Sequence, residues 1–212
     1  MSTSELALLA FTSFITLVNP FGIMPVFISM TSNLDKEARR AAAIRGGLVA
    51  FIILLLFALA GQFLSAFFGI SVNSFRMVGG IIFFLLGYDM LQARLSRIRV
   101  PDEKVDEYVG DISITPLAIP MITGPGSITN AIVLMEGAQD LLNKSVLVLV
   151  MAGVILINTL ALLFASRITK WLGETGNKVL MRLMGLIVMV IAVEFFFSGL
   201  RPMLRELLGI EL

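Results

Sequence analysis

Two short stretches of this sequence place proline and glycine inside hydrophobic runs. The first is Asn19-Pro20-Phe21-Gly22 and the second is Thr123-Gly124-Pro125-Gly126. Proline removes a backbone donor and clashes with the preceding helical turn, so each stretch frees backbone N–H and C=O groups that lipid cannot satisfy. Such groups are covered by protein or line a cavity. Each break therefore indicates a place where backbone atoms can hold a ligand.

The chemistry that the two breaks offer is recognition of a zwitterion. Asn19 before Pro20 is the N-cap and N1 signature of a new helix, and Gly124 before Pro125 predicts a second one. The free N–H groups at a helix N-terminus bind anions such as a carboxylate. The half-helices that precede the breaks are expected to leave carbonyl oxygens exposed at Leu17, Val18, Ile122 and Thr123. These oxygens suit an ammonium group or a small cation.

Size and charge limit the ligand further. Neither broken span contains a charged residue before Glu136, so a charged ligand side chain would lack a counter-charge. Gly22, Gly124 and Gly126 allow close backbone approach. Apolar bulk around the breaks comes from Phe21, Met24, Met121 and Ile128. The expected substrate is small, zwitterionic and otherwise neutral.

Four polar residues elsewhere in apolar runs are candidates for cavity lining or coupling. Asn130 and Asn158 either line the cavity or join helices by hydrogen bonds. Asp89 and Glu194 are carboxylates inside apolar runs, where an ionisable group is a functional candidate. Asp89 lies five residues before Arg94, which favours an interfacial charge, whereas Glu194 fits an ion pair or a proton relay equally well.

The elements that must position these residues are membrane helices. The chain has 212 residues, of which 58% are hydrophobic and 15% charged, and its mean hydropathy is +0.96. A tilted helix needs about 17 to 25 apolar residues to cross a bilayer. Six runs of about that length are present, at residues 6–30, 44–68, 72–91, 112–135, 146–165 and 179–200. No Lys or Arg precedes the first run, which argues against a cleaved signal peptide.

The residue types that are absent exclude most enzymatic chemistry. The sequence contains no cysteine and no histidine. It therefore lacks a thiol nucleophile, the commonest general base and the usual ligands of zinc or haem. The net charge of +1 gives no reason to expect nucleic acid binding. We expect no cofactor and no metal site, and we predict that the protein is not an enzyme.

Basic residues predict the orientation of the chain. The first, third and fifth loops hold four Lys and Arg each, which makes twelve of the sixteen in the sequence. Because basic loops stay in the cytoplasm, both termini are expected to lie outside. Residues 96–111 carry several carboxylates together with Pro101 and Gly110, which predicts a solvated cytoplasmic linker.

The two halves on either side of this linker are similar in order. Pro20 and Pro125 are 105 positions apart, and Arg76 to Gly79 matches Arg182 to Gly185 at a spacing of 106. Units with an odd number of spans must be inverted relative to one another, as in many secondary transporters. Both breaks lie about 20 Å along their spans. We predict one all-α transmembrane domain, 1–212, with six helices in two inverted-topology three-helix repeats, 1–95 and 112–212, whose spans one and four are broken near the midplane.

Residues 19–27 and 122–128 resemble the corresponding motifs of the MarC family of bacterial and archaeal inner-membrane proteins, and the resemblance covers essentially the whole chain. It implies an inverted-repeat fold in the inner membrane with both termini outside. Members called SnatA transport small neutral amino acids such as glycine and alanine. The family name reflects a proposed link to antibiotic resistance, which does not establish drug transport. The substrate-facing residues that the resemblance implies are Asn19, Pro20, Phe21, Gly22, Thr123, Gly124, Pro125, Gly126 and Ser127.

The predicted function is secondary transport of small neutral amino acids by alternating access. One alternative is an exporter of drugs or other hydrophobic compounds, and another is a non-transporting membrane protein. Na⁺ held by backbone and hydroxyl oxygens, or H⁺ carried by a carboxylate, could drive transport. The sequence leaves the direction of transport and the oligomeric state open.

Overall fold

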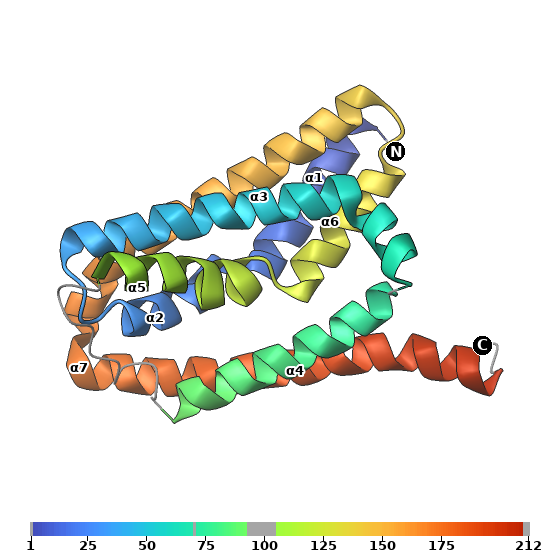
Figure 1. Ribbon diagram of the computed structural model, residues 1–212. Helices are drawn as coiled ribbons and strands as arrows, with labels where there is room; N and C mark the ends of the chain where they lie inside the picture. Colours follow the sequence, from blue (N-terminus) through green and yellow to red (C-terminus); the bar gives the residue numbers. More distant parts are fainter. Residues whose placement is uncertain (1, 70, 93–104, 210–212) are drawn as a thin grey trace.

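The computed structural model describes residues 2–69, 71–92 and 105–209, and the regular elements in these residues are all helical (Figure 1). In chain order they are α1 (Thr3–Val18), α2 (Pro20–Met30), α3 (Lys36–Phe68), α4 (Val72–Leu91), α5 (Val105–Ile112), the π-helical segment η3 (Ser113–Ile122), α6 (Pro125–Gly137) and α7 (Leu141–Leu208). The all-helical class predicted from the sequence is confirmed.

Side-chain caps start several of the helices. At the start of α1, the Ser2 Oγ accepts a hydrogen bond from the Glu5 N–H at 3.3 Å, and Glu5 Oε2 accepts one from the Ser2 N–H at 2.8 Å. Asp35 precedes α3 and Asp140 precedes α7, and each Oδ1 accepts the backbone N–H three residues later at 2.7 Å. These bonds satisfy N–H groups that a helix start leaves without an internal partner.

The helix α7 contains two arms instead of two separate helices. A straight helix of its 68 residues would be about 100 Å long at 1.5 Å per residue. Figure 1 shows that α7 turns back on itself, with the arms Leu141–Ala165 and Gly185–Arg205 running in opposite directions. The two arms correspond to the predicted fifth and sixth spans, and the connection between them, predicted as the fifth loop, has a helical backbone. The stretch contains no proline, so nothing in it removes a helical donor.

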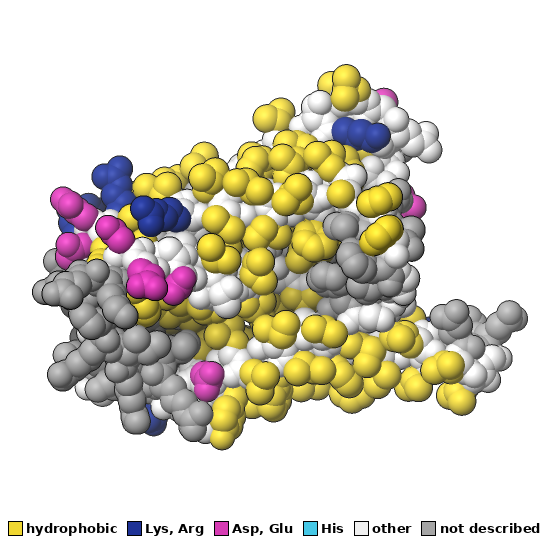
Figure 2. All heavy atoms as spheres, in the orientation of Figure 1, with side chains coloured by type: hydrophobic (Ala, Val, Ile, Leu, Met, Phe, Trp, Pro, Cys, Tyr) yellow, Lys and Arg dark blue, Asp and Glu magenta, His cyan; other side chains and the backbone are white. Residues whose placement is uncertain are grey.

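Apolar surface and helix length identify the chain as membrane-spanning. By length and composition, the described residues contain four candidate spans: 3–28, 36–61 and the two arms of α7. A fifth is present if α5 and η3 are counted together with α6, from which they are bent by 64°. Figure 2 shows a broad hydrophobic band on one face, with charged side chains gathered at the end where α3 begins. The predicted membrane class is confirmed, with four to five candidate spans among the described residues, and the six-span count stays a prediction.

The arrangement of the broken segments is antiparallel. In Figure 1, α1 and α2 run from the end of the molecule that holds the N-terminus to the opposite end, and η3 and α6 run back. The C-terminus lies at the same end as the N-terminus. The helix α3 packs along η3 and α6, while α4 packs mainly against α7. This arrangement brings the two breaks into the interior of the bundle.

Part of the predicted linker belongs to the bundle. Residues 105–112 form α5, with Val109 and Ile112 buried on one face. The Tyr108 hydroxyl donates a hydrogen bond to the Met30 carbonyl oxygen at 3.0 Å and joins α5 to the end of α2. Apolar residues three positions apart thus give this charged segment one buried side. The rest of the predicted linker, up to residue 104, lies outside the described residues.

The segment before the second break is irregular over its whole length. In η3, Thr115 and Ile119 have extended backbone dihedrals, and each precedes a proline. Proline disfavours helical conformation in the residue before it, which explains both interruptions. Pro116 and Pro120 are the sequence signal for this irregularity, which was not predicted.

Candidate functional site between the broken helices

At the first break, Asn19 ends one helix and begins the next. Its backbone is left-handed, with φ 46° and ψ 69°, and its N–H donates to the Ile15 carbonyl oxygen at the end of α1. Asparagine tolerates this conformation better than most residues. The Asn19 Oδ1 accepts a hydrogen bond from the Gly22 N–H at 3.2 Å, which is an N-cap bond to α2. The predicted capping role of Asn19 is therefore confirmed.

Gly22 is required by that side chain. A methyl group built on Gly22 would lie 2.6 Å from Asn19 Nδ2. Any larger residue at position 22 would displace the amide from the start of α2. The Asn19 side chain and the Gly22 backbone thus form one unit at the first break.

At the second break, α6 begins with Gly124 as N-cap and Pro125 in its first turn. The Thr123 N–H and Oγ1 both donate to the Ala118 carbonyl oxygen, at 2.8 and 2.7 Å. The Ser127 hydroxyl lies 3.4 Å from the Ile122 carbonyl oxygen, at the long end of hydrogen-bonding distance. A hydroxyl group thus approaches the Ile122 carbonyl oxygen, which was expected to be exposed.

The two breaks lie close together. A methyl group built on Gly126 in α6 would lie 2.9 Å from Leu17 Cδ2 in α1. One turn further along α6, the Asn130 amide donates to the Ser13 hydroxyl of α1 at 2.9 Å. Asn130 therefore joins the two broken segments, which is the packing role that the sequence analysis weighed against cavity lining.

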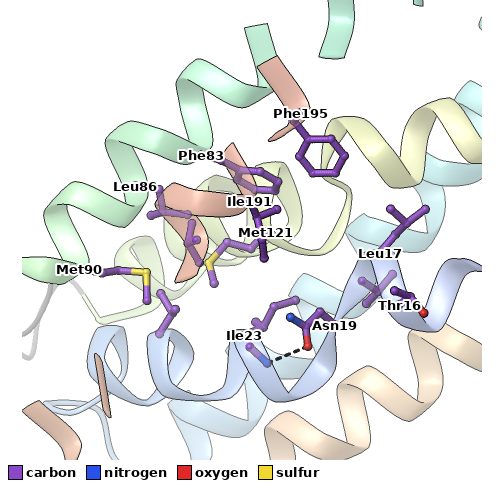
Figure 3. A pocket seen from close by; sticks show the side chains of 14 residues that line it. Thr16, Leu17, Asn19, Ile23, Phe83, Leu86, Met90, Met121, Ile191 and Phe195 are labelled. Carbon is purple, nitrogen blue, oxygen red and sulfur yellow. Dashed lines mark hydrogen bonds between the residues drawn. The ribbon is translucent and has the colours of Figure 1, made fainter. Parts of the chain in front are cut away.

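A cavity of about 270 Å³ lies beside the first break (Figure 3). Figure 3 shows Asn19 and Ile23 on one side of it and Phe83, Leu86 and Met121 facing them. The described residues that line it are Thr16, Leu17, Val18, Asn19, Gly22, Ile23, Val26, Phe83, Leu86, Met90, Met121, Val188, Ile191 and Phe195. None of them carries a charge. The Thr16 hydroxyl donates to the Thr12 carbonyl oxygen at 2.7 Å, so the Asn19 amide is the main polar side chain that a ligand would meet.

The predicted substrate-facing residues divide into two groups. Asn19 and Gly22 line the cavity. A second group is buried next to the cavity without lining it: Pro20, Thr123, Gly124, Pro125, Gly126 and Ser127. Met24 is also buried and is not part of the lining. The Phe21 side chain lies outside the described part of the structure.

Six of the fourteen described lining residues come from α4 and the second arm of α7, which were not predicted to contribute to the site. Phe83, Leu86 and Met90 are spaced at three and four positions on α4. A second set at three and four positions lies on α7 and consists of Val188, Ile191 and Phe195. This spacing places each set on one helix face. The only sequence signal was that periodicity, and it is shared by ordinary core residues.

The remaining polar candidates lie away from the cavity lining. Asp89 is half-buried on α4, and Glu194 is exposed on α7. Asn158 is fully buried, and neither its Oδ1 nor its Nδ2 has a hydrogen-bond partner among the described residues. No group of three His, Cys, Asp or Glu side chains in the described residues could hold a metal ion. A coupling role for Asp89 or Glu194 stays a prediction.

Comparison of the sequence with known proteins places this chain in a family. A family model described as MarC family integral membrane protein matches residues 5–204. The chain belongs to the MarC family. A UPF0056 membrane protein of Methanocaldococcus jannaschii is 37% identical over 195 residues, which cover 92% of this chain and 95% of that protein. A UPF0056 membrane protein of Bacillus subtilis is 33% identical over 196 residues, covering 91% and 93%.

The family assignment confirms the resemblance inferred from the two motifs. MarC proteins are integral membrane proteins and are not known as an enzyme family. This chain is therefore a multi-pass integral membrane protein whose surroundings are the lipid bilayer. No solved structure matches the chain.

Proposed function

We propose that this MarC protein is a secondary transporter of small neutral amino acids, with the substrate bound between the two broken helices. The observation that carries the proposal is the convergence of two oppositely directed breaks beside one cavity whose described lining bears no charge. Helix N-termini at such breaks hold anionic groups of substrates in secondary transporters. Alternating access would then arise from movement of one half of the chain against the other.

We extend the proposal to the architecture, in which six spans form two inverted three-helix repeats. Asp35 and Asp140 support it, because they cap α3 and α7 and are 105 positions apart, as are Pro20 and Pro125. Both termini at one end of the molecule also fit an even number of crossings. The basic loops support an orientation in which that end faces outward across the cell membrane, which in a bacterium with two membranes is the inner one.

The size of the cavity favours a small substrate. Pockets for drug-sized ligands usually measure about 300 to 1,000 Å³. A cavity of about 270 Å³ lies below that range and suits a molecule such as glycine or alanine. The carboxylate would lie at the start of α2 or α6, and the ammonium group would meet the Asn19 Oδ1 and backbone carbonyl oxygens. A charged substrate side chain would find no counter-charge among the described lining residues.

The apolar wall supports one second candidate, export of small hydrophobic compounds. Of the described lining residues, only Thr16 and Asn19 have polar side chains, and the Thr16 hydroxyl is already bonded to its own helix. A hydrophobic compound would therefore be accepted by most of the cavity surface. Competition distinguishes the two functions, since glycine would not inhibit transport of such a compound.

Uptake by purified protein in liposomes tests the proposed function. Labelled glycine and alanine are offered under a Na⁺ gradient and, separately, under a proton gradient. We expect uptake above that of protein-free liposomes under at least one gradient, which also identifies the coupling ion. Absence of uptake under both gradients, with protein shown to be folded and inserted, would contradict the proposal.

Substitution of Asn19 tests the site. Asn19→Gly keeps the left-handed backbone and lowers cap stability by only a few tenths of a kcal/mol. We expect it to lose most glycine uptake because it removes the cavity's main polar side chain. The matched control is Asn33→Gly, in the exposed turn between α2 and α3, which should transport normally. Normal glycine uptake by Asn19→Gly would show that the Asn19 side chain is not part of the substrate-binding site.

A further inference from the structure

Two phenyl rings stand between the cavity and the second break. A methyl group built on Gly124 would lie 2.7 Å from the Phe83 Cζ, and one built on Gly126 would lie 2.6 Å from the Phe195 Cζ. Both rings also line the cavity. They pair with each other at a centroid distance of 5.9 Å and an interplanar angle of 33°. Figure 3 shows the two rings side by side at the cavity wall.

These contacts make the two breaks unequal. The Asn19 amide faces the cavity directly, whereas Gly124 and Gly126 are buried against the ring edges, and Ser127, next in the chain, is also buried. The hydrogen atoms at a phenyl edge carry partial positive charge and accept no hydrogen bond from a backbone N–H. In this conformation the rings, and not a substrate, occupy the space next to the start of α6.

We propose that Phe83 and Phe195 form an aromatic gate that limits the size of the substrate side chain and controls access to the start of α6. This inference rests on the proposed transport function. Phe83 belongs to α4 and Phe195 to the second arm of α7, and these two elements pack mainly against each other. A shift of that pair relative to α6 would withdraw both rings from Gly124 and Gly126 together.

Substrate range tests the size limit. Phe83→Ala and Phe195→Ala are compared with wild type for uptake of glycine, alanine, leucine and phenylalanine in liposomes. We expect the ratio of leucine to glycine uptake to rise about tenfold, the scale on which apolar pockets discriminate by size. Phe83→Leu, which keeps part of the apolar volume, should give a smaller rise.

Exposed phenylalanines on the same helices provide matched controls. Phe84 is 41% exposed and Phe197 is 46% exposed, and neither lines the cavity. Phe84→Ala and Phe197→Ala should keep the wild-type substrate range. If wild type takes up glycine and both Phe83→Ala and Phe195→Ala keep the wild-type substrate range, the proposed gate is contradicted, whereas the proposed transport function is not.

Thiol labelling tests access without relying on transport. The chain contains no cysteine, so Ser127→Cys introduces a single thiol at a position that is 1% exposed. We expect a small water-soluble thiol reagent to label it several-fold faster when Phe83→Ala or Phe195→Ala is added. Equal labelling rates would contradict the gate. Faster labelling in a protein that takes up no amino acid would support the gate and refute the transport function.

Discussion

At the scale of single residues, the asparagine side chains of the helical bundle differ in how well their hydrogen-bonding groups are satisfied. Asn19 and Asn130 both make hydrogen bonds that join helical segments. Asn158, with 0% of its surface exposed, leaves its whole amide without a partner among the described residues. A buried polar group without a partner destabilises a fold by about 1 to 3 kcal/mol. No hydrogen bond to the described residues therefore offsets the burial of the Asn158 amide.

Asn158→Leu tests this interpretation. The two side chains are similar in size, so we expect the substitution to raise the melting temperature, by about 2 to 4 °C for each kcal/mol gained. We also expect slower transport, because the apolar side chain favours this conformation over any state that satisfies the amide. Thermal unfolding in detergent and liposome uptake measure the two effects.

The neighbouring Thr159→Val is the control for Asn158→Leu. The Thr159 hydroxyl donates to the Ile155 carbonyl oxygen of its own helix at 2.9 Å. Its loss should change the melting temperature little. A fall in melting temperature for Asn158→Leu would show that the amide is paired in the folded protein.

At the scale of elements, small residues fix the distance between α4 and the second arm of α7. A methyl group built on Gly87 would lie 2.7 Å from the Gly185 carbonyl oxygen, and one on Gly185 would lie 2.7 Å from that of Gly87. Gly80 approaches the Ala192 carbonyl oxygen in the same way, at 2.7 Å. These residues are seven positions apart on each helix, a repeat that keeps them on one face. Gly80, Gly87 and Gly185 therefore allow the two helices to pack closely.

Gly87→Ala is expected to destabilise the protein. Alanine is ordinarily better than glycine inside a helix by about 1 kcal/mol. Here the added methyl group meets backbone atoms, which cannot move aside as a side chain can, and overpacking of this kind costs about 1 to 3 kcal/mol. Replacement of glycine by alanine, which ordinarily stabilises a helix, is therefore expected to lower the stability of the protein at position 87.

Gly153→Ala in the first arm of α7 is the matched substitution. A methyl group there meets nothing within 4 Å. We expect an unchanged or higher melting temperature for Gly153→Ala and a lower one for Gly87→Ala. Equal changes in melting temperature for the two variants would show that α4 and α7 can move apart without loss of stability.

At the scale of the whole molecule, the sequence predicted the features that depend on backbone chemistry. Asn19 and Pro20 mark the first break because few residues fit a left-handed cap followed by a helix start. The cavity wall formed by Phe83 and Phe195 was not predicted, since apolar residues at helical spacing also form ordinary core. The continuity of α7 was missed because hydropathy separates apolar runs without reporting whether the backbone between them stays helical.

Orientation is tested with single thiols in this cysteine-free chain. Ser4→Cys near the N-terminus and Lys36→Cys at the start of α3 are both at exposed positions. We expect a membrane-impermeant maleimide to label Ser4→Cys in intact cells and Lys36→Cys only after lysis, because basic loops stay in the cytoplasm. The reverse pattern would place the termini inside.

The unequal surroundings of the two breaks have a consequence for the proposed transport cycle. Under the proposed repeat, positions 105 residues after Asn19, Gly22 and Val26 are Gly124, Ser127 and Ala131. The first set lines the cavity and the second is buried. If the two halves exchange conformations, the second set of residues becomes accessible to substrate as the first set becomes buried. The surface of α6 that is buried here then lines the pathway to the opposite side of the membrane. The differences between the two proposed repeats would in this way provide for both conformations.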